Sequence, residues 1–227
     1  MMRAKLMLLG AAAAVGLSST AAVASVVVVR SLGPSSKAYP PGKTLPETAK
    51  ITLQGGDVIT VLGPGSAQTL RGPGNFAPGQ VTLASAASKR GRFGAIRATE
   101  VAKNPSIWDI DVTQSGKMCV ATPNKVQLWR PESDSAMKIN IRSSDGKAQE
   151  LSWPAGKATA AWPGAMPITS GAEYQIEWPD SGEKSKLTFV TVPSAPADVV
   201  GAAQLLIQNG CQHQLDLLVD SASKVGN

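Results

Sequence analysis

Few residues of this chain carry the chemistry that catalysis needs. His213 is the one histidine among 227 residues. A Ser-His-Asp or Cys-His triad would need it, and neither a Gly-x-Ser-x-Gly elbow nor a His-Glu-x-x-His zinc helix occurs. The glycine-rich turns at 63–65 and 72–74 contain prolines and lack the following Lys-Ser/Thr step of a phosphate-binding loop. We therefore predict a protein that is not an enzyme, with no metal site and no cofactor.

Asp109 and Asp111 are the carboxylates best placed to share a ligand. They alternate with apolar residues from Trp108 to Val112, so in one strand both lie on one face, about 6.6–6.8 Å apart at the backbone. A carboxylate-based hydrolase is the least favoured function, because alternating polarity is the usual pattern of a half-buried strand.

Tryptophans are the second group of candidates. Three of the five stand directly before a proline, and Trp129 precedes Arg130-Pro131. Proline keeps the preceding residue extended and donates no ladder hydrogen bond, so these tryptophans are predicted at strand ends or edges. There they either stack on a sugar or pack into a core. The candidate ligand contacts are Trp129, Trp153, Trp162 and Trp178, and a cell-wall glycan-binding protein is the alternative function.

Two cysteines, Cys119 and Cys211, make an even count. In an oxidising compartment this favours a disulfide over two thiols. The bridge would close a loop of roughly 90 residues. It would stabilise the folded state by about 4–5 kcal/mol, because it lowers the conformational entropy of the unfolded chain. The alternative is that both are buried as small apolar side chains.

The first 24 residues follow the order of a secretory signal peptide. Arg3 and Lys5 precede an uncharged apolar stretch from 6 to 16, and Ala22-Val23-Ala24 fits the small-residue requirement of signal peptidase. Cleavage between Ala24 and Ser25 would release the protein into the periplasm, with no membrane span left. The alternative is an uncleaved N-terminal membrane anchor, because residues 6–29 are uncharged and about 20 apolar residues cross a bilayer.

The net charge of the chain argues against a nucleic-acid-binding protein. Cleavage would remove two basic residues and no acidic one, so the formal net charge of +6 would fall to +4. This mild excess suits an anionic envelope surface but gives no concentrated basic face.

The element pattern is mainly β with a helical end. Val26 to Val29 and the runs at 51–53, 58–62 and 69–70, separated by glycine turns, predict a small β domain over 25–84. Residues 85–106 are predicted to form a linker, which contains a basic cluster at 89–92. Short strands over 107–193 predict a sandwich of immunoglobulin or fibronectin type. Residues 194–227 predict two short helices, broken at Gly210, and a tail.

The segment 53–62, Leu-Gln-Gly-Gly-Asp-Val-Ile-Thr-Val-Leu, followed by Thr-Leu-Arg-Gly-Pro-Gly at 69–74, resembles the FecR-type domain of bacterial envelope proteins. The resemblance covers about residues 48–84, and the segment 125–193 is similar to immunoglobulin-like modules that accompany such domains. A FecR regulator relays a periplasmic signal to a cytoplasmic sigma factor. Only about five residues precede the apolar segment here, so no cytoplasmic domain is expected.

These features together predict a non-catalytic periplasmic sensor, scaffold or adaptor that acts through contacts with an envelope protein. A glycan is the alternative partner, and nucleic acid is not expected. The disulfide is expected to fasten the C-terminal helices to the sandwich.

Overall fold

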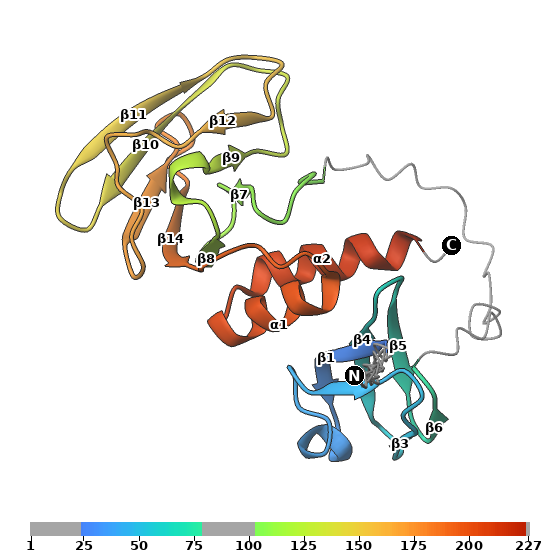
Figure 1. Cartoon of the computed structure of the whole chain (residues 1–227). Helices are drawn as coiled ribbons and strands as arrows, with labels where there is room; N and C mark the ends of the chain where they lie inside the picture. The colour runs from blue at the N-terminus through green and yellow to red at the C-terminus, as the bar shows by residue number, and fades with distance from the viewer. Residues whose placement is uncertain (1–23, 79–102, 226–227) are drawn as a thin grey trace, which may run out of the picture.

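The computed structural model describes residues 24–78 and 103–225 (Figure 1). The predicted signal segment up to residue 23 and the basic cluster at 89–92 lie outside these residues. As predicted, the described chain is mainly β and ends in two helices. Within it, no helix is both long and apolar enough to span a bilayer.

The first β unit is built from strands on both sides of glycine turns. A four-stranded antiparallel sheet has the order β2-β1-β4-β5, and β3 pairs with β6 in a two-stranded sheet. A short 3-10 helix, Pro34–Lys37, follows β1. The strands are β1 (Ser25–Leu32), β2 (Thr44–Pro46), β3 (Ile51–Leu53), β4 (Val58–Leu62), β5 (Ala67–Arg71) and β6 (Gly74–Phe76).

The four consecutive valines of β1 are all buried because both faces of the sheet are covered. Val26 and Val28 pack with Ile51 and Ile59 inside the first β unit. Val27 and Val29, which alternate with them along β1, point to the opposite face. They form a second core with the C-terminal helices. A valine run without alternation is the pattern of such a doubly buried strand.

The second β unit is a sandwich of two sheets. One sheet has the order β11-β10-β13-β14-β8, and the other has the order β12-β9-β7. The β8–β14 and β7–β9 pairs are parallel, and the others are antiparallel. The strands are β7 (Ile110–Asp111), β8 (Gly116–Val120), β9 (Gln127–Trp129), β10 (Met137–Ser143), β11 (Ala148–Trp153), β12 (Thr159–Ala161), β13 (Glu173–Glu177) and β14 (Lys184–Thr191).

The C-terminal hairpin consists of α1 (Val199–Asn209) and α2 (Gln212–Val225). Asp198 caps α1, since its side chain accepts a hydrogen bond from the Gly201 backbone N–H at 2.8 Å. Gly210 ends α1 in the left-handed conformation, with φ of 71°, which confirms the predicted break.

The helical hairpin lies between the two β units (Figure 1). Its apolar side chains share one core with Val27 of the first unit and with Cys119 and Val192 of the sandwich. An ion pair joins Arg30 of β1 to Asp216 of α2 at 2.5 Å. The first β unit and the sandwich are therefore held together by residues from the end of the chain.

Candidate functional site

The disulfide prediction is confirmed. Cys119 and Cys211 are bonded, with their Cα atoms 5.8 Å apart, and both side chains are fully buried. Cys119 lies in β8, an edge strand of the five-stranded sheet, and Cys211 lies between the two helices. The bridge fastens the helical hairpin to the sandwich, as expected.

Gln214 forms a second tie at the same place. Its side-chain oxygen accepts a hydrogen bond from the Cys119 N–H at 2.6 Å, and its amide nitrogen donates to the Cys119 carbonyl at 2.9 Å and the Ile107 carbonyl at 2.7 Å. The amide thus pairs with the edge of β8 that has no neighbouring strand, and it replaces the backbone hydrogen bonds that such a strand would make. Nothing in the sequence singled out this residue, because its partners lie about 100 positions earlier.

The candidate tryptophans stand at strand ends, as the proline neighbours predict, but no exposed row results. Trp129 ends β9 and Trp153 ends β11, and both are buried. Trp162 packs edge-on against Tyr174 and donates its indole N–H to the Met166 carbonyl at 2.6 Å. The side chain of Trp178 is half-buried and packs against the sandwich core.

Asp109, Asp111 and His213 line one cleft of about 290 Å³ between the sandwich and α2. β7 covers only residues 110 and 111, so Asp109 precedes the strand. Burial raises the pKa of the Asp109 carboxyl. Asp111 accepts hydrogen bonds from the Thr113 N–H at 2.9 Å and hydroxyl at 2.6 Å, which makes it a turn-forming residue. Among the described side chains, no three His, Cys, Asp or Glu residues are grouped to hold a metal ion.

The residues of the Gly-Asp segment have a structural role. Asp57 is buried, and its carboxylate accepts hydrogen bonds from the Ser35 N–H at 2.9 Å and the Gln54 N–H at 2.6 Å. Burial alone would raise the pKa of Asp57, but the hydrogen bonds from Ser35 and Gln54 outweigh it, and the pKa is lowered. At Gly72 a Cβ atom would collide with the Gln54 carbonyl, so only glycine fits.

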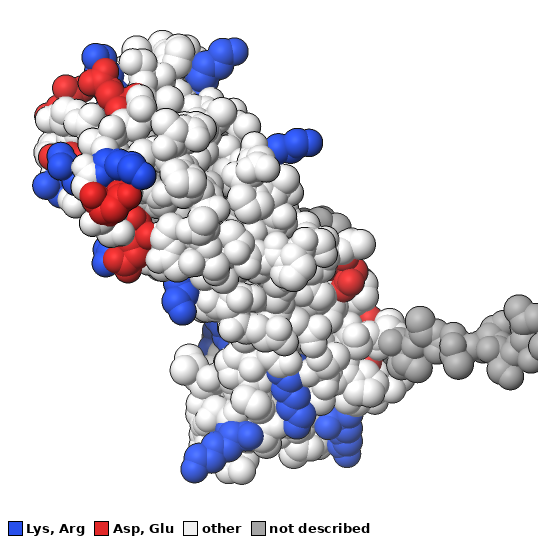
Figure 2. All heavy atoms as spheres, turned by 60° about the vertical axis from the view of Figure 1, so that its left-hand side comes forward, with Lys and Arg blue, Asp and Glu red and all other residues white. Residues whose placement is uncertain are grey.

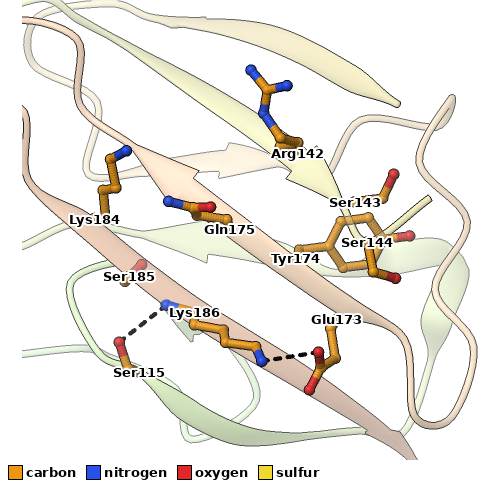
Figure 3. A pocket seen from close by; sticks show the side chains of 10 residues that line it. All are labelled: Ser115, Arg142, Ser143, Ser144, Glu173, Tyr174, Gln175, Lys184, Ser185 and Lys186. Atoms are coloured by element: carbon orange, nitrogen blue, oxygen red, sulfur yellow. Dashed lines mark hydrogen bonds and ion pairs between the residues drawn. The ribbon is translucent and has the colours of Figure 1, made fainter. Parts of the chain in front are cut away.

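A surface groove crosses the outer face of the five-stranded sheet (Figure 3). Its volume is about 490 Å³. Register places Arg142 of β10 opposite Gln175 of β13, which lies opposite Lys186 of β14. The Lys186 N–H donates to the Ser115 hydroxyl at 3.0 Å, which extends the row toward β8. With strands about 4.8 Å apart, the row is about 14 Å long. We call these four residues the sheet groove.

Basic and acidic side chains lie side by side at the sandwich end of the molecule (Figure 2). The charges of the sheet groove itself are unevenly paired. Lys186 contacts Glu173 at 2.9 Å, and the neighbouring Lys184 contacts Glu177 at 3.6 Å. No carboxylate in the described parts of the chain lies within ion-pair distance of Arg142, and Figure 3 shows its side chain directed away from the strand. The groove offers donors for acidic or carbonyl groups. Sequence reasoning missed it because the row exists only once the strand register is known.

No protein-family model, curated protein or solved structure matches this chain.

Proposed function

We propose that the chain is a non-catalytic exported protein that acts in the periplasm as a scaffold, sensor or adaptor through contacts with an envelope protein. The observation that carries the proposal is the sheet groove, in which Arg142 is left without a carboxylate partner on an otherwise paired sheet face. The partner therefore presents acidic side chains to Arg142 and Lys186.

The ion pairs on this surface are exposed and weak, so a binding partner can replace them. The Lys186 and Glu173 side chains are 63% and 42% exposed, and pairs of this kind contribute about 0–1 kcal/mol. Lys186 can therefore exchange Glu173 for a carboxylate of the partner at little cost. A partner carboxylate at Arg142 would gain a charge-assisted hydrogen bond with no competing group to displace.

Three features support export. The buried disulfide is typical of proteins from oxidising compartments. β1 begins at Ser25, so cleavage after Ala24 would leave every strand of the first sheet whole. The resemblance of residues 48–84 to the FecR-type domain points to the same compartment.

Photo-crosslinking in the producing bacterium tests the contact. A photoreactive residue at Gln175 should crosslink to one discrete envelope protein, and Arg142→Glu should abolish the product. Lys125→Glu makes the same charge change at an exposed lysine outside the groove, and it should leave the product unchanged. If Arg142→Glu and Lys125→Glu behave alike, the sheet groove is not the contact surface.

Intact-mass analysis tests export separately. Protein recovered from the periplasmic fraction should begin at Ser25. A membrane-bound species that retains Met1 would contradict cleavage and support the N-terminal anchor.

A further inference from the structure

A third pocket, of about 640 Å³, opens at the end of the sandwich where β13 turns into β14. Lys184, the first residue of β14, lines it. The helical hairpin packs near Val190 and Val192, at the other end of the same strand. Seven residue steps at about 3.3 Å place the two ends about 23 Å apart. We call this cavity the tip pocket.

Apolar side chains form one part of the tip pocket. Val112 is buried, and Met137 and Trp178 are half-buried, with all three in the core cluster or packed against it. Trp178 is the candidate tryptophan that lines this pocket. Ligand sites of this size usually combine an apolar wall with a few fixed polar groups.

Arg130 supplies a fixed donor. Its side chain is held by the sandwich, because Nε donates to the Lys157 carbonyl at 3.0 Å and Nη2 donates to the Pro154 carbonyl at 2.9 Å. The residue is 3% exposed, and its guanidinium lies 5.2 Å from the Trp153 ring centroid. Within residues 24–78 and 103–225, Nη1 makes no hydrogen bond and no carboxylate pairs with Arg130. A buried guanidinium thus keeps unused donors at the pocket.

Positively and negatively charged side chains complete the lining of the tip pocket. Two ammonium groups are already paired, Lys138 with Glu150 at 2.8 Å and Lys184 with Glu177 at 3.6 Å. The carboxylates that line the pocket form no ion pair with any described residue, and they belong to Glu132, Asp180 and Glu183. An anionic ligand would meet these three carboxylates, and a cationic ligand would meet Arg130.

We infer that the tip pocket binds a neutral saccharide. Hydroxyl groups both donate and accept, so one uncharged ligand can use the Arg130 donors and the carboxylate acceptors together, where a ligand of single charge would be repelled by one set. A sugar ring also presents C–H groups that can pack on the face of Trp178. Of the residues that line the tip pocket, only Lys184 also borders the groove that contains Arg142, and it is paired with Glu177. The saccharide inference uses neither Arg142 nor Lys186, so it does not depend on the protein-contact proposal.

Isothermal titration calorimetry on the mature chain tests the inference. The probes are trisaccharides of β-1,4-linked N-acetylglucosamine, α-1,4-linked glucose and β-1,4-linked mannose, with glutarate and cadaverine as single-sign controls. At least one trisaccharide should bind with a Kd between about 10 μM and 1 mM, tighter than either charged probe.

Matched variants locate the site. Glu132→Gln and Asp180→Asn keep side-chain shape, and each should weaken saccharide binding about fivefold, because a hydroxyl group then donates to a neutral amide oxygen in place of a charged carboxylate. Asp134→Asn removes a neighbouring exposed carboxylate that does not line the pocket, and binding should stay within about twofold.

Three results would overturn the inference. One is the absence of binding by the whole trisaccharide panel at about 10 mM, well above the expected Kd. The second is tighter binding of glutarate or cadaverine than of any saccharide. The third is an equal loss of binding in Asp134→Asn and the two pocket variants, which would place the sugar elsewhere.

Discussion

Replacing Gln214 by leucine should destabilise the junction between the helices and the sandwich. The change removes three hydrogen bonds, of which the two to Cys119 are buried, and leaves the N–H and C=O of Cys119 without partners. Cys119 is fully buried, so each orphaned group costs about 1–3 kcal/mol. Leucine recovers part of this by burying apolar surface, about 1–2 kcal/mol. At the midpoints of these ranges the net loss is about 2.5 kcal/mol, or a fall in Tm of about 5–10 °C for a chain of this size.

Urea denaturation followed by circular dichroism measures the loss, with Gln212→Leu as the matched control. Gln212 lies on the same helix, is exposed and makes one side-chain hydrogen bond, to Asp216 at 2.8 Å. Its replacement should change the free energy of unfolding by no more than about 0.5 kcal/mol. Equal losses in the two variants would refute the role assigned to Gln214.

Gln214→Glu gives a second, pH-dependent readout. Glutamate keeps the acceptor for the Cys119 N–H but places a carboxylate beside two carbonyl oxygens. The native state therefore favours the protonated side chain, which raises its pKa above the unfolded value. The stability of this variant relative to the parent should rise as pH falls, and a flat difference would contradict the geometry.

Three further predictions concern stability. Replacing Cys119 and Cys211 together by serine should lower the free energy of unfolding by about 4–5 kcal/mol, since the bridge spans 92 positions; a loss below about 1 kcal/mol in denaturant titration would contradict it. Gly72→Ala should lower Tm because its Cβ meets a backbone carbonyl, whereas Gly65→Ala, with open space around it, should not; thermal melts of the two compare them directly. The lowered pKa of Asp57 gives stability that is full above the ordinary value of 3.8 and is lost as pH falls through the folded value; acid titration of Asp57→Asn should show a shallower loss.

The fold was predictable where the pattern is local. The stretches 137–141 and 187–192 contain β-branched or alternating residues, which predict strands. β10 contains all of the first stretch, and β14 contains all but the last residue of the second. β12 was missed because Thr159-Ala160-Ala161 has neither alternation nor a β-branched run. The cysteine pairing was predictable because two cysteines allow one bridge.

The surfaces were less predictable because they depend on register and burial. Arg142 and Gln175 are ordinary polar residues until β10 and β13 pair. In the sequence, Arg130 stands out only as the middle residue of Trp129-Arg130-Pro131. Its side chain is held by backbone carbonyls that lie more than 20 positions later. No periodicity in the sequence reports such contacts.

The shared core between β1 and the helical hairpin constrains the order in which the chain can fold. Val27 is synthesised early, yet Leu206, which belongs to the same core, follows about 180 positions later. Until the last thirty residues emerge, one face of the first sheet has no cover, and its apolar strands remain exposed to other chains. A chain truncated before α1 should therefore aggregate, because this apolar face then keeps no cover.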